Sequence, residues 1–266
     1  MIDRFKRNIN YLRVSVTDRC NLRCVYCMPE QGVELIKHKE ILTFEEIAGI
    51  VRVGVKLGID KVRITGGEPL VRHGIVDLVT MLAEIKGIKD LAMTTNGVFL
   101  DKYAEPLAKA GLHRVNVSLD TMDSKKFRQI TRVGNIETVL RGIDAAKAAG
   151  LTPVKINCVI KKSPLEEDAQ QVAAYCKEND LKARFIKEMD LEDGIFSKVI
   201  GGEGGHCAVC NRLRLTANGM IKPCLFSDLE FDVRKLGVKE AYLQAVGQKP
   251  RSGTENKVNK FSNIGG

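Results

Sequence analysis

The stretch Lys61-Val62-Arg63-Ile64-Thr65-Gly66-Gly67-Glu68-Pro69 contains the pattern that decides the fold. A short run rich in β-branched residues is followed at once by two glycines, as in a strand that ends in a tight turn. The longer segment after it has the apolar spacing of an amphipathic helix. A strand followed by a helix is a βα unit, so this stretch indicates parallel strands connected by helices.

The same unit repeats along the chain. Strand-like runs, each followed by a segment of helical character, are expected at Leu12–Val16, Lys61–Thr65, Asp90–Thr94, Arg114–Leu119, Val154–Ile160 and Ala183–Lys187. A capping box formed by Thr43 and Glu46 predicts the start of one helix, and Gly58 and Gly111 are expected to end helices. Six such units favour an α/β fold with a parallel sheet, either open or closed into an incomplete barrel.

Composition and charge restrict the class of protein. The chain has 266 residues, 44% of them hydrophobic, which suits one large globular α/β domain, or a main domain with an appendage. No apolar run is long enough to span a membrane, and residues 1–11 do not resemble a secretory signal, so a cytoplasmic location is expected. The net charge of +9 favours an anionic partner. Because Trp is absent and aromatic residues make up 5%, a phosphorylated small molecule suits the chain better than nucleic acid.

Six of the eight cysteines form two groups of three. We call Cys20, Cys24 and Cys27 the first triplet, and Cys207, Cys210 and Cys224 the second triplet. A metal centre held by only three thiolates keeps one coordination position open for chemistry. A zinc site completed by a histidine is the alternative, and His206 adjoins the second triplet. The remaining two, Cys158 and Cys176, lie in apolar patterns and are expected to be buried.

Polar residues follow the ends of four of the predicted strands. The first triplet follows the first strand, Gly66-Gly67-Glu68-Pro69 the second, Thr94-Thr95-Asn96-Gly97 the third, and Ser118 and Asp120 the fourth. The carboxyl ends of parallel strands meet at one edge of a sheet or barrel. The sequence therefore predicts one site at that edge.

These motifs resemble a known family. The first triplet, with Tyr26 before its last cysteine and Gly66-Gly67-Glu68-Pro69 after the next strand, resembles the radical S-adenosylmethionine superfamily. The resemblance narrows to the GTP 3′,8-cyclases of molybdenum-cofactor biosynthesis through residues 12–20 (LRVSVTDRC), 64–70 (ITGGEPL), 116–120 (NVSLD), 210–215 (CNRLRL) and the final Gly265-Gly266. It implies an incomplete (β/α)6 TIM-like barrel with a C-terminal iron–sulfur extension.

The resemblance also implies two cofactors, a pair of 4Fe–4S clusters and S-adenosylmethionine. The first triplet would hold the cluster that cleaves S-adenosylmethionine to a 5′-deoxyadenosyl radical. The residues implied to contact S-adenosylmethionine are Tyr26, Gly66, Gly67, Glu68, Ser118 and Met189. Each has a structural alternative, because glycines also serve turns, and Ser118 and Met189 could cap a strand and pack in a core.

GTP is the substrate that the resemblance implies. The second triplet would hold a second 4Fe–4S cluster facing the guanine. Implied substrate contacts are Arg13, Arg63, Thr94, Lys155, Arg212 and Arg214, and Arg212 and Arg214 alternate as on one strand face. The radical would remove the ribose 3′ hydrogen, and the product would be 3′,8-cyclo-7,8-dihydro-GTP. The resemblance also implies that Gly265 and Gly266 reach into the active site.

The resemblance implies three further partners. They are a reducing protein or small reductant, a downstream cyclic pyranopterin monophosphate synthase and, as one arrangement the sequence allows, a second copy in a homodimer.

One departure from the family pattern separates Met189 from Cys207. Only residues 190–206 connect them, several tens fewer than usual, and they include a glycine run at Gly201, Gly202, Gly204 and Gly205. We therefore divide the chain into a partial barrel (1–190), a shortened glycine-rich connection (191–206) and a segment carrying the second triplet (207–266). A connecting strand, helix and pocket wall are expected to be missing. Two other functions stay open: a radical enzyme acting on a peptide or another anion, and a non-catalytic zinc or iron–sulfur scaffold that binds a nucleotide or RNA.

Overall fold

A single curved sheet organises the molecule. The computed structural model describes residues 1–264, and its sheet has the strand order β6-β5-β4-β3-β2-β1-β7-β8-β9. The first six strands are parallel: β1 (Tyr11–Ser15), β2 (Lys61–Thr65), β3 (Asp90–Thr95), β4 (Arg114–Ser118), β5 (Lys155–Ile160) and β6 (Lys182–Lys187). All six predicted strands are confirmed, with ends that differ by at most one residue.

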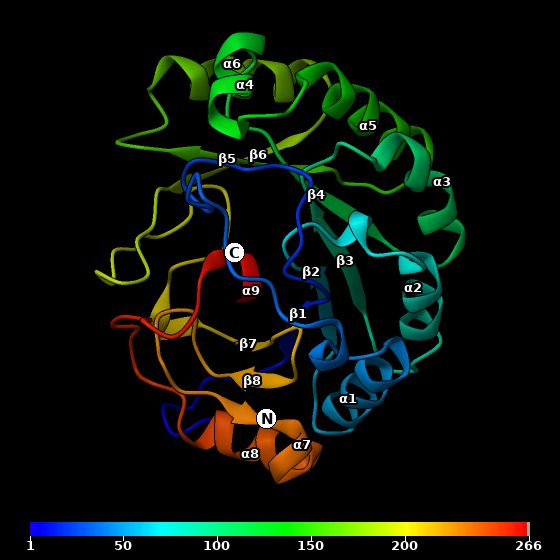
Figure 1. Ribbon diagram of the computed structural model, residues 1–266, viewed down its shortest axis with the longest axis vertical. Helices are drawn as coiled ribbons and strands as arrows, with labels where there is room; N and C mark the ends of the chain where they lie inside the picture. Colours follow the sequence, from blue (N-terminus) through cyan, green and yellow to red (C-terminus); the bar gives the residue numbers. More distant parts are fainter. Residues whose placement is uncertain (265–266) are drawn as a thin grey trace.

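Helices cover the outer face of these strands (Figure 1). They are α1 (Phe44–Lys56), α2 (Ile75–Ala83), α3 (Leu100–Lys109), α4 (Ser124–Thr131), α5 (Ile136–Ala148) and α6 (Glu167–Glu178), with short 3₁₀ helices at His38–Glu40, Pro69–Val71 and Cys207–Val209. The capping box of α1 is confirmed, because Glu46 N donates to Thr43 Oγ1 (3.2 Å) and Thr43 N donates to Glu46 Oε2 (2.7 Å). Gly58 and Gly111 adopt positive φ just after α1 and α3, as expected.

The C-terminal segment continues the same sheet. Strand β7 (Arg212–Leu215) pairs in parallel with β1, and β8 (Met220–Lys222) and β9 (Phe231–Asp232) follow in antiparallel order. Helices α7 (Val233–Leu236), α8 (Val238–Gly247) and α9 (Phe261–Ile264) complete the described chain. In the described chain β6 and β9 are the two edge strands of the sheet and do not pair with each other, so the barrel is incomplete, as the sequence predicts.

The core lies between the sheet and its outer helices. Alternate strand residues such as Leu12, Val14 and Ile64 are fully buried there, so the intervening residues point to the inner side. Cys158 and Cys176 are buried in this core, as expected. In the part of the chain that the structure describes, no helix is long and apolar enough to cross a membrane.

Candidate active site

A row of arginines crosses the inner face of the sheet. In the strand register Arg13 on β1 pairs with Arg63 on β2 and with Arg214 on β7. The row continues through Ala92 on β3 to Arg114 on β4. Side chains in register on adjacent parallel strands lie side by side, so the sheet places several guanidinium groups together. The sheet therefore brings four of the predicted substrate contacts to one cavity: Arg13, Arg63, Arg212 and Arg214.

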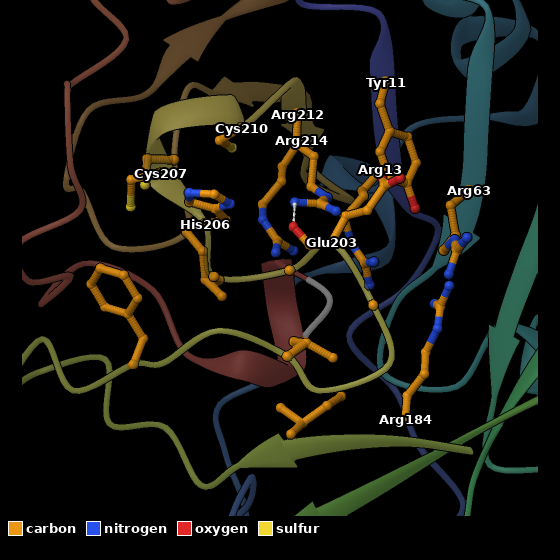
Figure 2. Close-up of a pocket in the computed structure, with 18 of the residues that line it drawn as sticks. Tyr11, Arg13, Arg63, Arg184, Glu203, His206, Cys207, Cys210, Arg212 and Arg214 are labelled. Carbon is orange, nitrogen blue, oxygen red and sulfur yellow. Dashed lines mark hydrogen bonds between the residues drawn. The ribbon is translucent and has the colours of Figure 1, made fainter. Parts of the chain in front are cut away.

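These cations line a cavity of about 520 Å³. Its positive residues are Arg13, Lys61, Arg63, Arg114, Lys155, Arg184, Arg212, Arg214 and Lys249, whereas its acidic residues are Asp90 and Glu203. Arg114 is already paired with Asp90. Figure 2 shows Arg63 and Arg184 reaching toward one another from opposite sides of the cavity. The surplus of positive charge makes the cavity suited to a ligand with several negative charges.

The pKa values of three of these cations are lowered, mainly by burial. Burial and then the neighbouring arginines lower the pKa of Lys155 to about 8, and burial followed by Arg13 lowers that of Arg214 to about 9. The pKa of Arg63 falls to about 10, mainly through burial. The Nε atom of Arg63 and the Oγ1 atom of Thr94 are buried without a hydrogen-bond partner among the described residues. Buried polar atoms are nearly always bonded, so both atoms point to a missing polar ligand.

The second triplet forms another part of the wall of this cavity. Cys207 begins a 3₁₀ helix, Cys210 lies just before β7, and Cys224 follows β8, yet all three line the cavity. In Figure 2 Cys210 lies near Arg212, and Cys207 lies beside His206 on the side away from the arginines. A group bound by these thiols would therefore face a ligand held by the arginines.

The first triplet lies in the loop after β1, held by the ends of β3 and β4. The Asn96 amide donates to Cys20 Sγ (3.8 Å), and Leu22 N donates to the same sulfur (3.4 Å). Tyr26 OH donates to Asp120 Oδ2 (2.7 Å). Burial raises the pKa of Cys20 to about 11 and that of Asp120 to about 6. A metal that binds Cys20 must therefore displace its proton.

The donor sets of both triplets suit 4Fe–4S clusters. Within residues 1–264, no three Cys, His, Asp or Glu side chains are placed to hold one metal ion. A 4Fe–4S cluster makes a different demand, because each thiolate binds a different iron and the sulfurs need not converge on one point.

The Gly66-Gly67-Glu68 motif supports the loop of the first triplet from behind. Gly67 N donates to Thr17 O (2.6 Å), and a Cβ on Gly67 would lie 2.3 Å from the Arg19 carbonyl oxygen. The Glu68 carboxylate accepts hydrogen bonds from Leu70 N, Thr95 Oγ1 and Asn96 N. Burial raises its pKa to about 7. The close approach that requires glycine here is therefore to the protein's own loop, while contact with S-adenosylmethionine stays a prediction.

The C-terminal tail enters the interior of the partial barrel, where Figure 1 shows α9. Ile264 is fully buried, and its carbonyl accepts a hydrogen bond from Arg214 (3.4 Å). Gly265 and Gly266, predicted to reach the active site, lie outside the described residues. Of the other predicted residues, Met189 lines the cavity, whereas Ser118 ends β4 and is half-buried.

The connection at residues 190–206 supplies part of the cavity wall. It contains isolated bridges, Asp190 to Ile195 and Phe185 to Ile200, rather than a strand or helix. Phe196, Val199 and the residues around Glu203 line the cavity, and the Glu203 carbonyl accepts from Arg212 (3.2 Å). The short connection therefore forms part of the cavity wall that we expected to be missing.

Sequence reasoning missed several residues of the site. Arg114, Lys61 and Arg184 line the cavity together with the predicted cations. Lys61 could have been found from the sequence, because it is two residues before Arg63 on β2 and so lies on the same face of the sheet. The strand order, which the sequence does not give, determines which face of the sheet encloses the cavity. The sequence predicts that Asp120 lies at a strand end, but it gives no sign of the hydrogen bond from Tyr26.

Comparison with known proteins identifies the class to which this fold and site belong. Residues 14–176 match the family model of the radical SAM superfamily. A solved structure named "Native anSMEcpe with bound AdoMet" shares the fold, with a TM-score of 0.63, 15% identity and coverage of 91% of this chain and 81% of that one.

Sequence relatives define the family within that class. A GTP 3′,8-cyclase of Thermodesulfovibrio yellowstonii is 43% identical, and the match covers 100% of both chains. One from Petrotoga mobilis is 42% identical with the same coverage. A third, from Geobacter sulfurreducens, is 39% identical over 100% of this chain and 99% of its own. The chain belongs to the GTP 3′,8-cyclase family of radical SAM enzymes.

Proposed function

We propose that the protein converts GTP to 3′,8-cyclo-7,8-dihydro-GTP, an early step of molybdenum-cofactor biosynthesis. The observation that carries this proposal is the cavity in which the second triplet adjoins a row of arginines. A triphosphate carries several negative charges, which suit this row of cations, and the thiols line the same cavity as the arginines. Family membership supplies the reaction.

The cofactors are S-adenosylmethionine and 4Fe–4S clusters. The first triplet would hold one cluster and the second triplet the other, through Cys20, Cys24 and Cys27 and through Cys207, Cys210 and Cys224. When bound, the first cluster and S-adenosylmethionine supply an organic radical that takes the 3′ hydrogen of the ribose.

The residues of this chain bind and orient the substrate. Arg13, Arg63 and Arg214 offer planar guanidinium groups that suit bidentate contacts with phosphate oxygens. Lys155 adds a point charge from β5, and the hydroxyl of Thr94 is available to the ribose or a phosphate. The apolar side chains of Phe196 and Phe226 stack on each other (4.5 Å between ring centroids) and help to exclude water from the wall beside the thiols. A dry, oriented substrate protects a radical from side reactions.

Several partners belong to this proposal as well. A reducing protein or small reductant would supply the electron, and a cyclic pyranopterin monophosphate synthase would consume the product. We also propose that the protein forms a homodimer and is located in the cytoplasm.

Anaerobic incubation of the reconstituted protein with dithionite, S-adenosylmethionine and GTP tests the proposed function. We expect 5′-deoxyadenosine and a cyclic GTP-derived product in equal amounts, measured by chromatography and mass spectrometry. Arg63→Gln should lower the rate of both. Formation of 5′-deoxyadenosine with no GTP-derived product would contradict the proposal and favour a peptide or another anion as the substrate.

A further inference from the structure

A buried lysine lies behind the second triplet. Lys249 follows α8, and only 1% of the residue is exposed. Its Nζ atom donates to the Arg212 carbonyl (2.7 Å) and to the Pro223 carbonyl. These two carbonyls lie beside the second triplet, since Arg212 is two residues after Cys210 and Pro223 directly precedes Cys224. Lys249 therefore connects the chain segments that carry two of the three thiols.

The positive charge of Lys249 has no carboxylate partner in the described part of the chain. Lys222, on neighbouring β8, is also fully buried, but its Nζ lies 3.4 Å from a carboxylate oxygen of Glu230. Carbonyl groups satisfy the hydrogen bonds of an ammonium group without cancelling its charge, so a buried lysine of this kind is costly unless an anion is near.

The sulfurs of the second triplet are the groups placed to provide that anion. Lys249 lines the same cavity as Cys207, Cys210 and Cys224. Thiolates that bind iron are anionic, so iron binding would complete the charge pair.

We propose that Lys249 is a positioning residue for the second cluster, which holds Cys210 and Cys224 in place and balances the charge of the cluster they bind. This inference rests on the proposed assignment of the second triplet as cluster ligands. Adding an electron makes a cluster more negative, so a fixed positive charge beside it favours the reduced form. Lys249 should therefore raise the reduction potential of the second cluster.

The test uses the full chain with Cys20, Cys24 and Cys27 all changed to Ala, so that any cluster present belongs to the second triplet. We expect about four irons per chain after anaerobic reconstitution. In this background Lys249→Met should lower the ratio of reduced to oxidised cluster at a fixed potential about tenfold, a shift of about 59 mV for a one-electron couple. Redox titration followed by electron paramagnetic resonance measures that shift.

Lys222→Met is the matched control, because it removes a buried ammonium group of the same segment whose charge Glu230 already balances. It should shift the potential less than Lys249→Met. Equal potentials in the background protein and in Lys249→Met, at full iron content, would overturn the role of Lys249 and leave the ligand assignment intact. A background protein that binds no iron would refute the ligand assignment and this inference with it.

A second pair of variants covers the case in which Lys249→Met loses its iron. Lys249→Arg keeps the charge, whereas Lys249→Gln keeps a hydrogen-bond donor without the charge. The proposal predicts that the Arg variant retains more iron, with a potential nearer that of the background protein. Equal iron and equal potential in the two variants, or a better result for Gln, would show that the charge of Lys249 is not what the cluster requires.

Discussion

Arg13 and Arg214 occupy paired positions on the adjacent parallel strands β1 and β7, although they come from opposite ends of the chain. Their guanidinium groups share a buried environment, and the charge of Arg13 is the largest effect after burial that lowers the pKa of Arg214. Guanidinium groups placed side by side give this part of the cavity a positive charge that suits an anionic ligand.

Arg63 provides the clearest test of anion binding, because its side chain is buried and its Nε atom lacks a partner in the described structure. We expect Arg63→Gln to weaken GTP binding about tenfold or more, which corresponds to about 1.4 kcal/mol. The free energy of unfolding of the ligand-free protein should not fall, because a poorly compensated charge is removed. Calorimetric titration with GTP and denaturant unfolding measure the two effects.

The control for this variant is Arg52→Gln on the exposed face of α1. It makes the same chemical change outside the cavity and should alter GTP affinity by less than about twofold, as is usual for an exposed charge. Equal losses of affinity in the two variants would mean that general charge, rather than the arginine row, attracts the nucleotide.

Lys155 should make GTP binding depend on pH. Its pKa in the free protein is about 8, below the usual value, because burial and neighbouring cations disfavour its charged form. A bound triphosphate favours the charged form and raises this pKa, so binding takes up a proton above about pH 8 and affinity falls as the pH rises. Titration calorimetry at pH 8.5 in buffers with different ionisation enthalpies measures the proton uptake.

Lys155→Arg keeps the charge but removes this titration, because an arginine stays protonated at pH 8.5. We expect proton uptake to decrease clearly in this variant while GTP still binds. Unchanged uptake would assign the titration to another group.

Gly67→Ala should disturb the first triplet without touching it. The added Cβ would meet the Arg19 carbonyl oxygen at 2.3 Å, and the loop that leads into Cys20 would have to shift. We predict a fall from about eight irons per chain toward about four, with the second cluster retained. Gly49→Ala in α1 is the matched control, since its Cβ would meet nothing within 4 Å, and a helical alanine stabilises by about 0.5–1 kcal/mol. A full iron content in Gly67→Ala would show that the loop tolerates the shift.

Tyr26→Phe should loosen the same loop from the sheet. It removes the hydrogen bond to Asp120, and Val159 N remains as a donor to that half-buried carboxylate. A lost hydrogen bond to an ionisable, half-buried acceptor costs about 1 kcal/mol, which denaturant unfolding of the metal-free protein would reveal. Tyr103→Phe on α3, whose hydroxyl has no hydrogen bond within residues 1–264, should change stability by less than half as much. Equal effects would show that the Tyr26 bond is not special.

The sequence predicts the parallel strands well because local patterns determine them. Lys61–Thr65 combines β-branched residues with a glycine turn, and the structure has a strand with those bounds. The strands β8 and β9 are too short for such a pattern, and they depend on pairing, β8 with β7 and β9 with β8. Because successive side chains of a strand point to opposite faces, the sequence also predicts that Arg212 and Arg214 face the same cavity.

The rest of the site depends on contacts between distant segments. That β7 pairs with β1, and so places Arg214 beside Arg13, follows from the closure of the sheet rather than from local sequence. Lys249 looks like an ordinary surface lysine in the sequence, and Asp120 like an ordinary strand-end residue. Their partners, beside the second triplet and at Tyr26, come from other parts of the chain.

Transfer of hydrogen from the substrate is the most direct measurement of the central claim, that the cavity holds GTP within reach of the radical. The protein is incubated anaerobically with dithionite, S-adenosylmethionine and GTP carrying deuterium at the ribose 3′ carbon. We expect one deuterium in the 5′-deoxyadenosine and none at that carbon in the cyclic product. 5′-Deoxyadenosine without deuterium, formed while the labelled GTP is recovered unchanged, would contradict it.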